Sequence, residues 1–215
     1  GFCSLNAQTT SSVNTAVGNI AMLNTTTGGC NTAVGASALC ANVSGINNVA
    51  VGFEALTKST TNNNTAVGVQ TAACTTSGFA TAIGYKTMKA NTTSSGNTAM
   101  GYEAMCSVTT GSNNSAFGLN ALAAVVSGVS NTAVGRDALE LNTADNNVAV
   151  GHCSLLSNTS GTRNTAVGTK TMKFTTTGSD NTVVGFQVMD SNTEGCCNTG
   201  VGGDALGGNQ TGSCN

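Results

Sequence analysis

The chain has 215 residues and a formal charge of −2, with seven Lys and Arg, nine Asp and Glu, and no Pro or Trp. Its basic residues are scattered, so no basic stripe is available for a phosphate backbone or a lipid surface. No apolar run has the length of a membrane-spanning helix or a signal-peptide core. We therefore expect neither a nucleic-acid partner nor a membrane partner.

One short motif recurs along the chain. The stretch "NTAVG" starts at Asn14 and returns at Asn31, Asn64, Asn131 and Asn164, with near copies such as "NTAMG" and "NSAFG" between them. The spacing is 17 residues, or 16 where a turn loses one residue before the next Asn. A turn tolerates such a loss, whereas a strand would reverse its side chains. The period predicts an all-β fold, a single-chain parallel β-solenoid (β-roll-like) of about 13 coils. The closing glycines lie at positions 1, 18, 35, 52, 68, 84, 101, 118, 135, 151, 168, 185 and 202.

Each coil is expected to start with a strand of the Thr-Ala-Val type, first at residues 15–17. Its period of two predicts Thr and Val inward and Ala outward, with the Val column in the core. The closing Gly permits a sharp bend. A second short strand should then carry a Leu or Met, which is found at the fifth position of every repeat when the glycine is counted as the first, except at Ala72. A "TTG"-type turn should end the coil. The small outward Ala would leave a flat face for lateral or trimeric packing.

The Asn that opens each motif is nearly invariant, and only Ala80 departs from it. Asn accepts turn conformations, and identical amides stacked in successive coils bond one another. We expect an asparagine ladder at Asn14, Asn31, Asn48, Asn64, Asn97, Asn114, Asn131, Asn147, Asn164, Asn181, Asn198 and Asn215.

A helical repeat is the alternative architecture. Units of 17 residues are too short for helix pairs, and each contains glycines that would destabilise a helix. We expect residues 1–215 to form one solenoid domain, uncapped at both ends, that stacks head-to-tail with further copies through its open ends.

The strand "NTAVG" and its variant "NNVAVG" resemble the head repeats (Hep/Hag-like) of trimeric autotransporter adhesins, whose β-roll trimerises. They are also similar to the "NTAVGxxAL..NTTG" repeats of tail-fibre-like surface proteins. The resemblance covers essentially the whole chain, although the adhesin repeat is shorter. It implies a fibre or adhesin located outside the cell, or on a cell or virion surface.

The sequence offers little catalytic chemistry. His152 stands beside Cys153 and Ser154, but it occupies a variable coil position, and a triad also needs an orienting group and a cavity. No zinc or calcium spacing occurs. We expect no enzyme, no catalytic residue, no metal and no cofactor.

Nine cysteines leave two interpretations open. Cys197 and Cys214 share one turn position in adjacent coils, which places them within reach of a disulfide. An odd number leaves a thiol for another molecule, and Cys3 is a candidate. These features favour an oxidising compartment, whereas small thiols that fill the core are the alternative.

Asn-x-Ser/Thr triplets are candidate glycosylation sites. Four of them share one turn position, so their glycans would project along one edge. The alternative is that an Asn- and Thr-rich repeat produces such triplets by chance. The triplets begin at Asn24, Asn42, Asn63, Asn91, Asn113, Asn158 and Asn209.

The sequence therefore predicts a structural subunit of an extracellular fibre or filament. An adhesin or tail-fibre shaft that works as a trimer is one alternative. An ice-binding β-solenoid is another, although the expected inward direction of the regular Thr column disfavours it.

Overall fold

The computed structural model describes residues 1–10 and 13–215, which form a parallel β-solenoid without any helix. The predicted fold class is thus confirmed. The described residues contain twelve strands rather than thirteen, because a strand precedes every glycine of the count except Gly1. The strands are β1 (Thr15–Val17), β2 (Thr32–Val34), β3 (Val49–Val51), β4 (Thr65–Val67), β5 (Thr81–Ile83), β6 (Thr98–Met100), β7 (Ser115–Phe117), β8 (Thr132–Val134), β9 (Val148–Val150), β10 (Thr165–Val167), β11 (Thr182–Val184) and β12 (Thr199–Val201).

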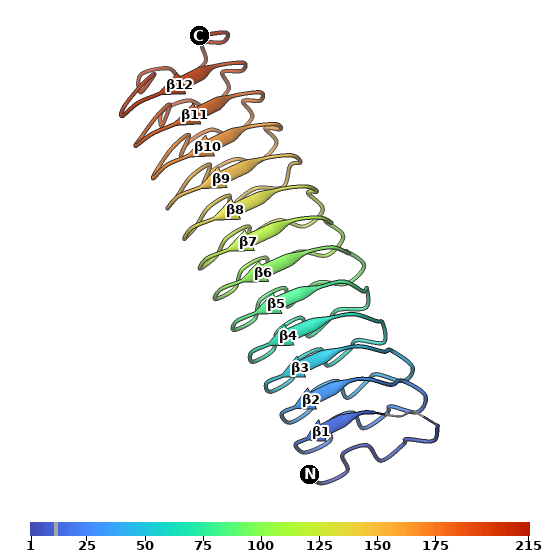
Figure 1. Ribbon diagram of the computed structural model, residues 1–215. Helices are drawn as coiled ribbons and strands as arrows, with labels where there is room; N and C mark the ends of the chain where they lie inside the picture. The colour runs from blue at the N-terminus through green and yellow to red at the C-terminus, as the bar shows by residue number, and fades with distance from the viewer. Residues whose placement is uncertain (11–12) are drawn as a thin grey trace. The chain divides into compact units, whose positions relative to one another are not determined.

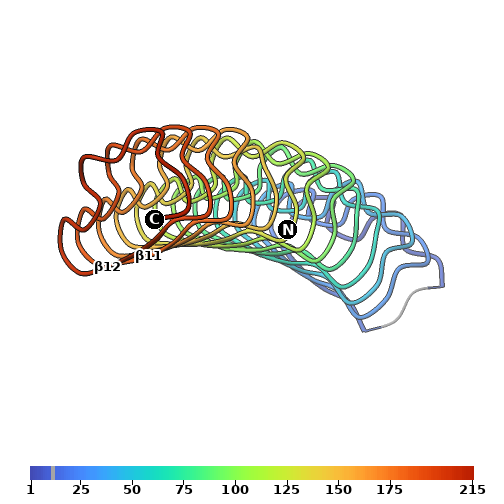
Figure 2. The same ribbon diagram turned by 90° about the horizontal axis from the view of Figure 1, so that it is seen from above.

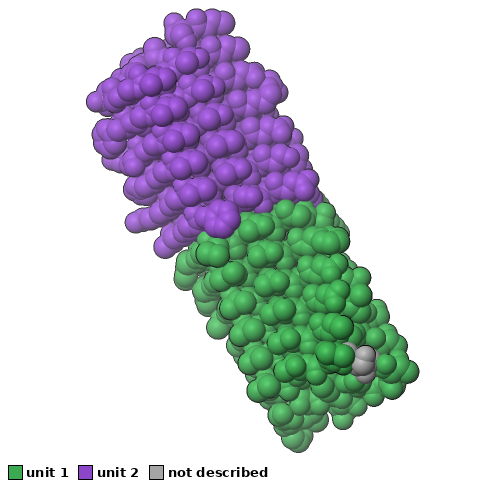
Figure 3. Space-filling view, in the orientation of Figure 1, with its two compact units in different colours: residues 1–110 green, residues 111–215 purple. Residues whose placement is uncertain are grey.

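The chain divides into two compact units, Gly1–Thr110 with β1 to β6 and Gly111–Asn215 with β7 to β12 (Figure 3). In each unit the strands follow one another in chain order and pair in parallel (Figure 1). The register is exact from coil to coil. Thr32 pairs with Val49, for example, and Ala33 pairs with Ala50. Equivalent residues therefore stack into columns along each unit.

The strands face the opposite way from the prediction. Ala33 is fully buried, whereas Val34 beside it is 36% exposed, and the same pattern holds in the other strands. The alternation of a strand shows that neighbouring side chains point to opposite sides, but it does not show which side faces the core. The coil is thin, and the large side chain of Leu39 already fills its interior, so the strand contributes a small residue to the core. The expected outward Ala face does not exist, and lateral packing on Ala is excluded.

The second half of the coil is not a strand. The second and fourth residues after the glycine of each strand have left-handed backbone, as in Ser37 at φ +59° and Leu39 at φ +51° after Gly35. Their backbone N–H groups donate in opposite directions, Ser37 to Asn19 in the preceding coil and Leu39 to Ala55 in the next. In Figure 2, β11 and β12 lie along one side of their coils, and turns close the other side.

The Leu and Met column is the core, as predicted. Burying each such side chain contributes about 1.5–3 kcal/mol. The left-handed backbone explains why this column holds Leu and Met but never Val or Ile, since β-branched residues are strained at positive φ. The fully buried members are Met22, Leu39, Leu56, Met88, Met105, Leu122, Leu139, Leu155, Met172 and Met189.

The glycine after each strand is required by the backbone. Gly151 has φ +134°, and a Cβ at this position would lie 2.4 Å from the carbonyl oxygen of Gly168 in the next coil. No side chain fits there without moving the stack. Within residues 1–10 and 13–215 there is no helix long and apolar enough to cross a membrane.

Candidate functional site

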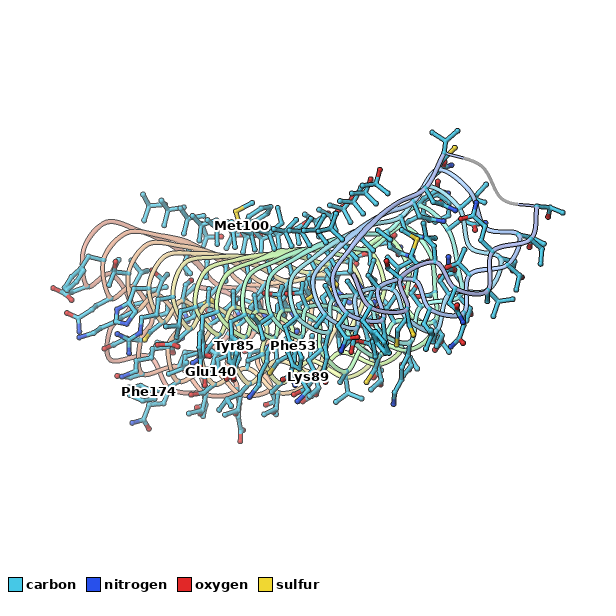
Figure 4. All side chains as sticks on the ribbon, turned by 90° about the horizontal axis from the view of Figure 1, so that it is seen from below. Phe53, Tyr85, Lys89, Met100, Glu140 and Phe174 are labelled. Atoms are coloured by element: carbon cyan, nitrogen blue, oxygen red, sulfur yellow. The ribbon has the colours of Figure 1, made fainter. Side chains whose placement is uncertain are left out.

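The outward side of the strands forms a regular surface, which we call the Thr/Val face. It consists of the first residue of each strand, the Thr rank, and the third residue, the Val rank. Because all charged residues lie outside the strands, neither rank carries a charge. In Figure 4, Met100 of the Val rank projects from one side of unit 1, whereas Tyr85 and Lys89 of that unit lie on the other side.

The Val rank exposes apolar side chains on seven of the twelve described strands, and its side chains on β3, β4, β5, β9 and β10 are half-buried. Val17 is 55% exposed and Met100 is 46% exposed in unit 1, and Phe117 is 38% exposed in unit 2. Soluble proteins rarely expose long contiguous rows of this kind without a partner. The rank holds Val at most positions, with larger side chains at Ile83, Met100 and Phe117.

The Thr rank presents hydroxyl groups. No hydrogen bond within the described part of the chain engages the hydroxyls of Thr32, Thr65 or Thr132. The Thr residues of the turns differ, because Thr26 Oγ1 donates to the Val43 carbonyl at 3.3 Å and Thr76 Oγ1 donates to the Thr92 carbonyl at 2.8 Å. The turn hydroxyls thus support the stack, whereas the strand hydroxyls face solvent.

The opening Asn residues form a buried hydrogen-bonded ladder in each unit. Asn31 Nδ2 donates to the Gly45 carbonyl of its own coil at 2.8 Å, and Asn31 Oδ1 accepts from the Asn48 backbone N–H of the next coil at 2.9 Å. One amide therefore closes its coil and joins two coils. Ala80 interrupts the ladder in unit 1; its N–H donates to Asn64 Oδ1 at 3.0 Å, but it has no amide to pass on.

The predicted outward row of glycosylation sites is wrong at three of its four positions. Asn42, Asn91 and Asn158 are fully buried, and Asn209 is partly exposed. Asn42 Oδ1 accepts from the Gly45 N–H at 2.9 Å, so its amide stabilises the turn. The sequence held a signal for burial, because Val108 and Val125 occupy the same column. Asn24, Asn63 and Asn113 are exposed.

All nine thiols are free, and the described residues contain no disulfide. Cys197 and Cys214 do occupy the same left-handed turn position of adjacent coils, at φ +58° and +61°, and both are exposed, but they are not bonded. Cys3 is partly buried. The structure thus places Cys197 and Cys214 in adjacent coils at the same position, but the predicted disulfide between them is not formed.

His152 and Cys153 meet a third group that the sequence did not indicate. Cys153 Sγ lies 3.2 Å from His152 Nε2, and Asp137 Oδ2 of the preceding coil lies 4.0 Å from the same nitrogen. Burial raises the pKa of the Cys153 thiol, and the Asp137 carboxylate raises it further. A raised pKa opposes the thiolate form, which is the form that acts as a nucleophile.

Two surface pairs were also missed by the sequence reasoning. Tyr85 and Tyr102, one coil apart, stack with ring centroids 5.2 Å apart. Arg163 donates through Nε and Nη2 to both carboxylate oxygens of Asp180, at 2.6 and 2.7 Å, which lowers the pKa of Asp180. In each pair the two residues occupy the same position of adjacent coils. A search for complementary residues 16 or 17 positions apart would therefore find such pairs in the sequence.

Comparison of the chain with protein-family models, with curated proteins and with solved structures gives no match. The class of protein is therefore set by the fold alone: a parallel β-solenoid with one strand per coil, an outward Thr/Val face and two buried columns rich in Asn.

Proposed function

We propose that the chain is a structural subunit of an extracellular fibre and that further copies of the chain pack on its Thr/Val face. The observation that carries this proposal is the uncharged apolar Val rank, which is exposed on three strands of unit 1 and four strands of unit 2 and half-buried on the others. Burying such a rank removes apolar area from water, at about 25 cal/mol per Å².

The partner that fits this face best is a second copy. Both ranks repeat at the spacing of neighbouring strands, about 4.8 Å, so an identical face matches them along its length. A Thr hydroxyl buried against another Thr rank keeps a hydrogen-bonding partner. The mixture of Val, Met and Phe suits an apolar contact between proteins, because side chains of different size can interdigitate there. This replaces the Ala face as the lateral surface.

The test is a matched pair of double variants. Val34→Lys with Val134→Lys places one charge on the Thr/Val face of each unit, at side chains that are 36% and 38% exposed. The control, Val43→Lys with Val126→Lys, adds the same charge at turn positions where both side chains are 45% exposed. Sedimentation velocity should show association of the wild type and the control and loss of association in the face variant. A monomeric wild type, or equal behaviour of both variants, contradicts the proposal.

Electron microscopy of the same samples measures the form of the assembly. The mass per particle separates a trimeric shaft, as in adhesins or tail fibres, from a larger bundle. Head-to-tail stacking stays a prediction, and growth along the solenoid axis in the face variant would reveal it as a separate contact.

A second candidate function is ice binding, which one observation now favours. The Thr rank lies on the outward side of the strands, so the inward Thr direction that would disfavour this function is not observed. Thermal hysteresis of the dispersed chain is the test. We expect it to fall in Thr65→Leu but not in the turn control Thr27→Leu if this candidate is correct; wild type without hysteresis excludes it.

A further inference from the structure

Three different metal-binding side chains converge on the surface of unit 2. Asp137, His152 and Cys153 each offer one donor atom, and these three atoms all lie within 4.8 Å of one another. A carboxylate oxygen, an imidazole nitrogen and a sulfur are the donors that Zn²⁺ takes in proteins. His152 is the only histidine of the chain.

The repeat itself creates this convergence. Asp137 and Cys153 occupy the same left-handed position of adjacent coils, each at φ +54°, and His152 immediately precedes Cys153. The donors therefore come from two coils, which explains why no zinc spacing is visible in the sequence.

Two of the donor separations are close to those around a tetrahedral ion, and the donors of Asp137 and Cys153 lie within 4.8 Å of each other. Donors around Zn²⁺ lie about 3.4–3.6 Å apart, and the observed separations of 3.2 Å for Cys153 and His152 and 4.0 Å for His152 and Asp137 lie on either side of that range. Asp137 is 8% exposed, and its Oδ1 accepts from Asn120 Nδ2 at 3.2 Å, which fixes the carboxylate. The side chain of His152 is 43% exposed, so an ion can reach the site.

We propose that Asp137, His152 and Cys153 bind one divalent cation of the zinc class, with solvent in the fourth position. The ion replaces the proton of the Cys153 thiol, which passes to solvent, while His152 binds as the neutral imidazole and Asp137 as the carboxylate. Bound metal would join the coil that carries Asp137 to the next coil, which carries His152 and Cys153.

Arg136 competes with a metal ion for the Asp137 carboxylate. Its Nε donates to Asp137 Oδ2 at 2.9 Å, the oxygen that faces His152, and its side chain is 67% exposed. Lys173 adds positive charge near Cys153, and Glu140 adds negative charge. Because the guanidinium occupies an oxygen that the ion needs, its removal should strengthen binding. A purely structural role of the cluster would not produce this effect.

The experiment titrates the metal-free, reduced full chain with Co²⁺ and then displaces it with Zn²⁺. We expect one equivalent of Co²⁺ with thiolate-to-cobalt absorption, and loss of that absorption in Cys153→Ser. His152→Ala and Asp137→Asn should weaken binding by at least about tenfold, since even the loss of a supporting partner costs that much. Arg136→Gln should strengthen it by about threefold.

Other thiols provide the control. Cys196→Ser, Cys197→Ser and Cys214→Ser combined should leave the absorption unchanged, and so should Cys74→Ser. Circular dichroism of each variant checks that the solenoid is folded. Three results overturn the proposal: no thiolate-to-cobalt absorption in the wild type, unchanged affinity in folded His152→Ala, or loss of the absorption in the triple variant.

Discussion

Asn164 Oδ1 accepts a hydrogen bond of 3.1 Å from the backbone N–H of Asn181, its equivalent in the next coil. Asn164 Nδ2 donates to the Gly178 carbonyl of its own coil at 2.8 Å. Asn provides both an acceptor and a donor on one short side chain, and both are needed in a place without solvent. This explains why the opening position of the motif is so constant.

Removing one amide from the ladder should therefore be costly. Asn164→Ala leaves the Asn181 N–H and the Gly178 carbonyl without these partners, which we expect to lower the free energy of unfolding by about 2–5 kcal/mol. Urea denaturation measures the change. The exposed Asn19→Ala is the matched control and should stay within about 0.5 kcal/mol of the wild type. Equal values for the two variants would mean that the ladder contributes nothing.

Completing the ladder in unit 1 should have the opposite effect. Ala80 is 1% exposed and stands where other coils carry Asn. Ala80→Asn adds an amide beside Asn64, and one further buried hydrogen bond is worth about 0.5–1.5 kcal/mol. The unfolding midpoint should rise. A fall would show that this coil has no room for the side chain.

The glycine after the strand should tolerate no side chain. Gly151→Ala places a Cβ in contact with the Gly168 carbonyl oxygen and forces a non-glycine residue to φ +134°, which we expect to cost about 3 kcal/mol. In Gly203→Ala the new Cβ meets nothing within 4 Å, so its stability should be nearly unchanged. The measurement is the thermal unfolding midpoint of each variant. Similar midpoints for the two variants would argue against a strained turn at Gly151.

In the core of unit 2, two larger side chains are accommodated by a glycine in the neighbouring strand. Val183 and Val188 stand where most coils have Ala, and Gly200 faces them in β12. A Cβ at Gly200 would lie 2.8 Å from Val188 Cγ1. Gly200→Ala should cost about 1–3 kcal/mol, and Val188→Ala should relieve at least about 0.5 kcal/mol of that in a double-mutant cycle. Strictly additive effects would contradict this packing.

Much of the fold follows from the sequence because the columns are so regular. The period located the strands, the glycine turns and the Leu and Met core, and the Asn column indicated a ladder. The direction of the strand did not follow, because alternation gives relative orientation only and a thin coil buries its smaller residue, such as Ala33, rather than Val34.

The left-handed backbone of the second half of the coil could not be predicted either, because Ser and Leu, as at Ser37 and Leu39, are not residue types that favour positive φ. A signal was present in the fifth-position column, which is apolar but never β-branched. The cluster at Asp137 required the stacking register of two coils, and the burial of Asn42 required the same register. Such contacts become visible once the repeat is written with its coils aligned.

Oxidation of the six methionines by dilute peroxide tests the strand direction, on which the proposed function depends. Met100 is 46% exposed on the Thr/Val face, whereas Met22, Met88, Met105, Met172 and Met189 are fully buried. Mass spectrometry of the dispersed chain should find rapid conversion of Met100 to the sulfoxide and slow conversion of the other five, and assembly should protect Met100. Protection of Met100 in the dispersed chain would contradict the account.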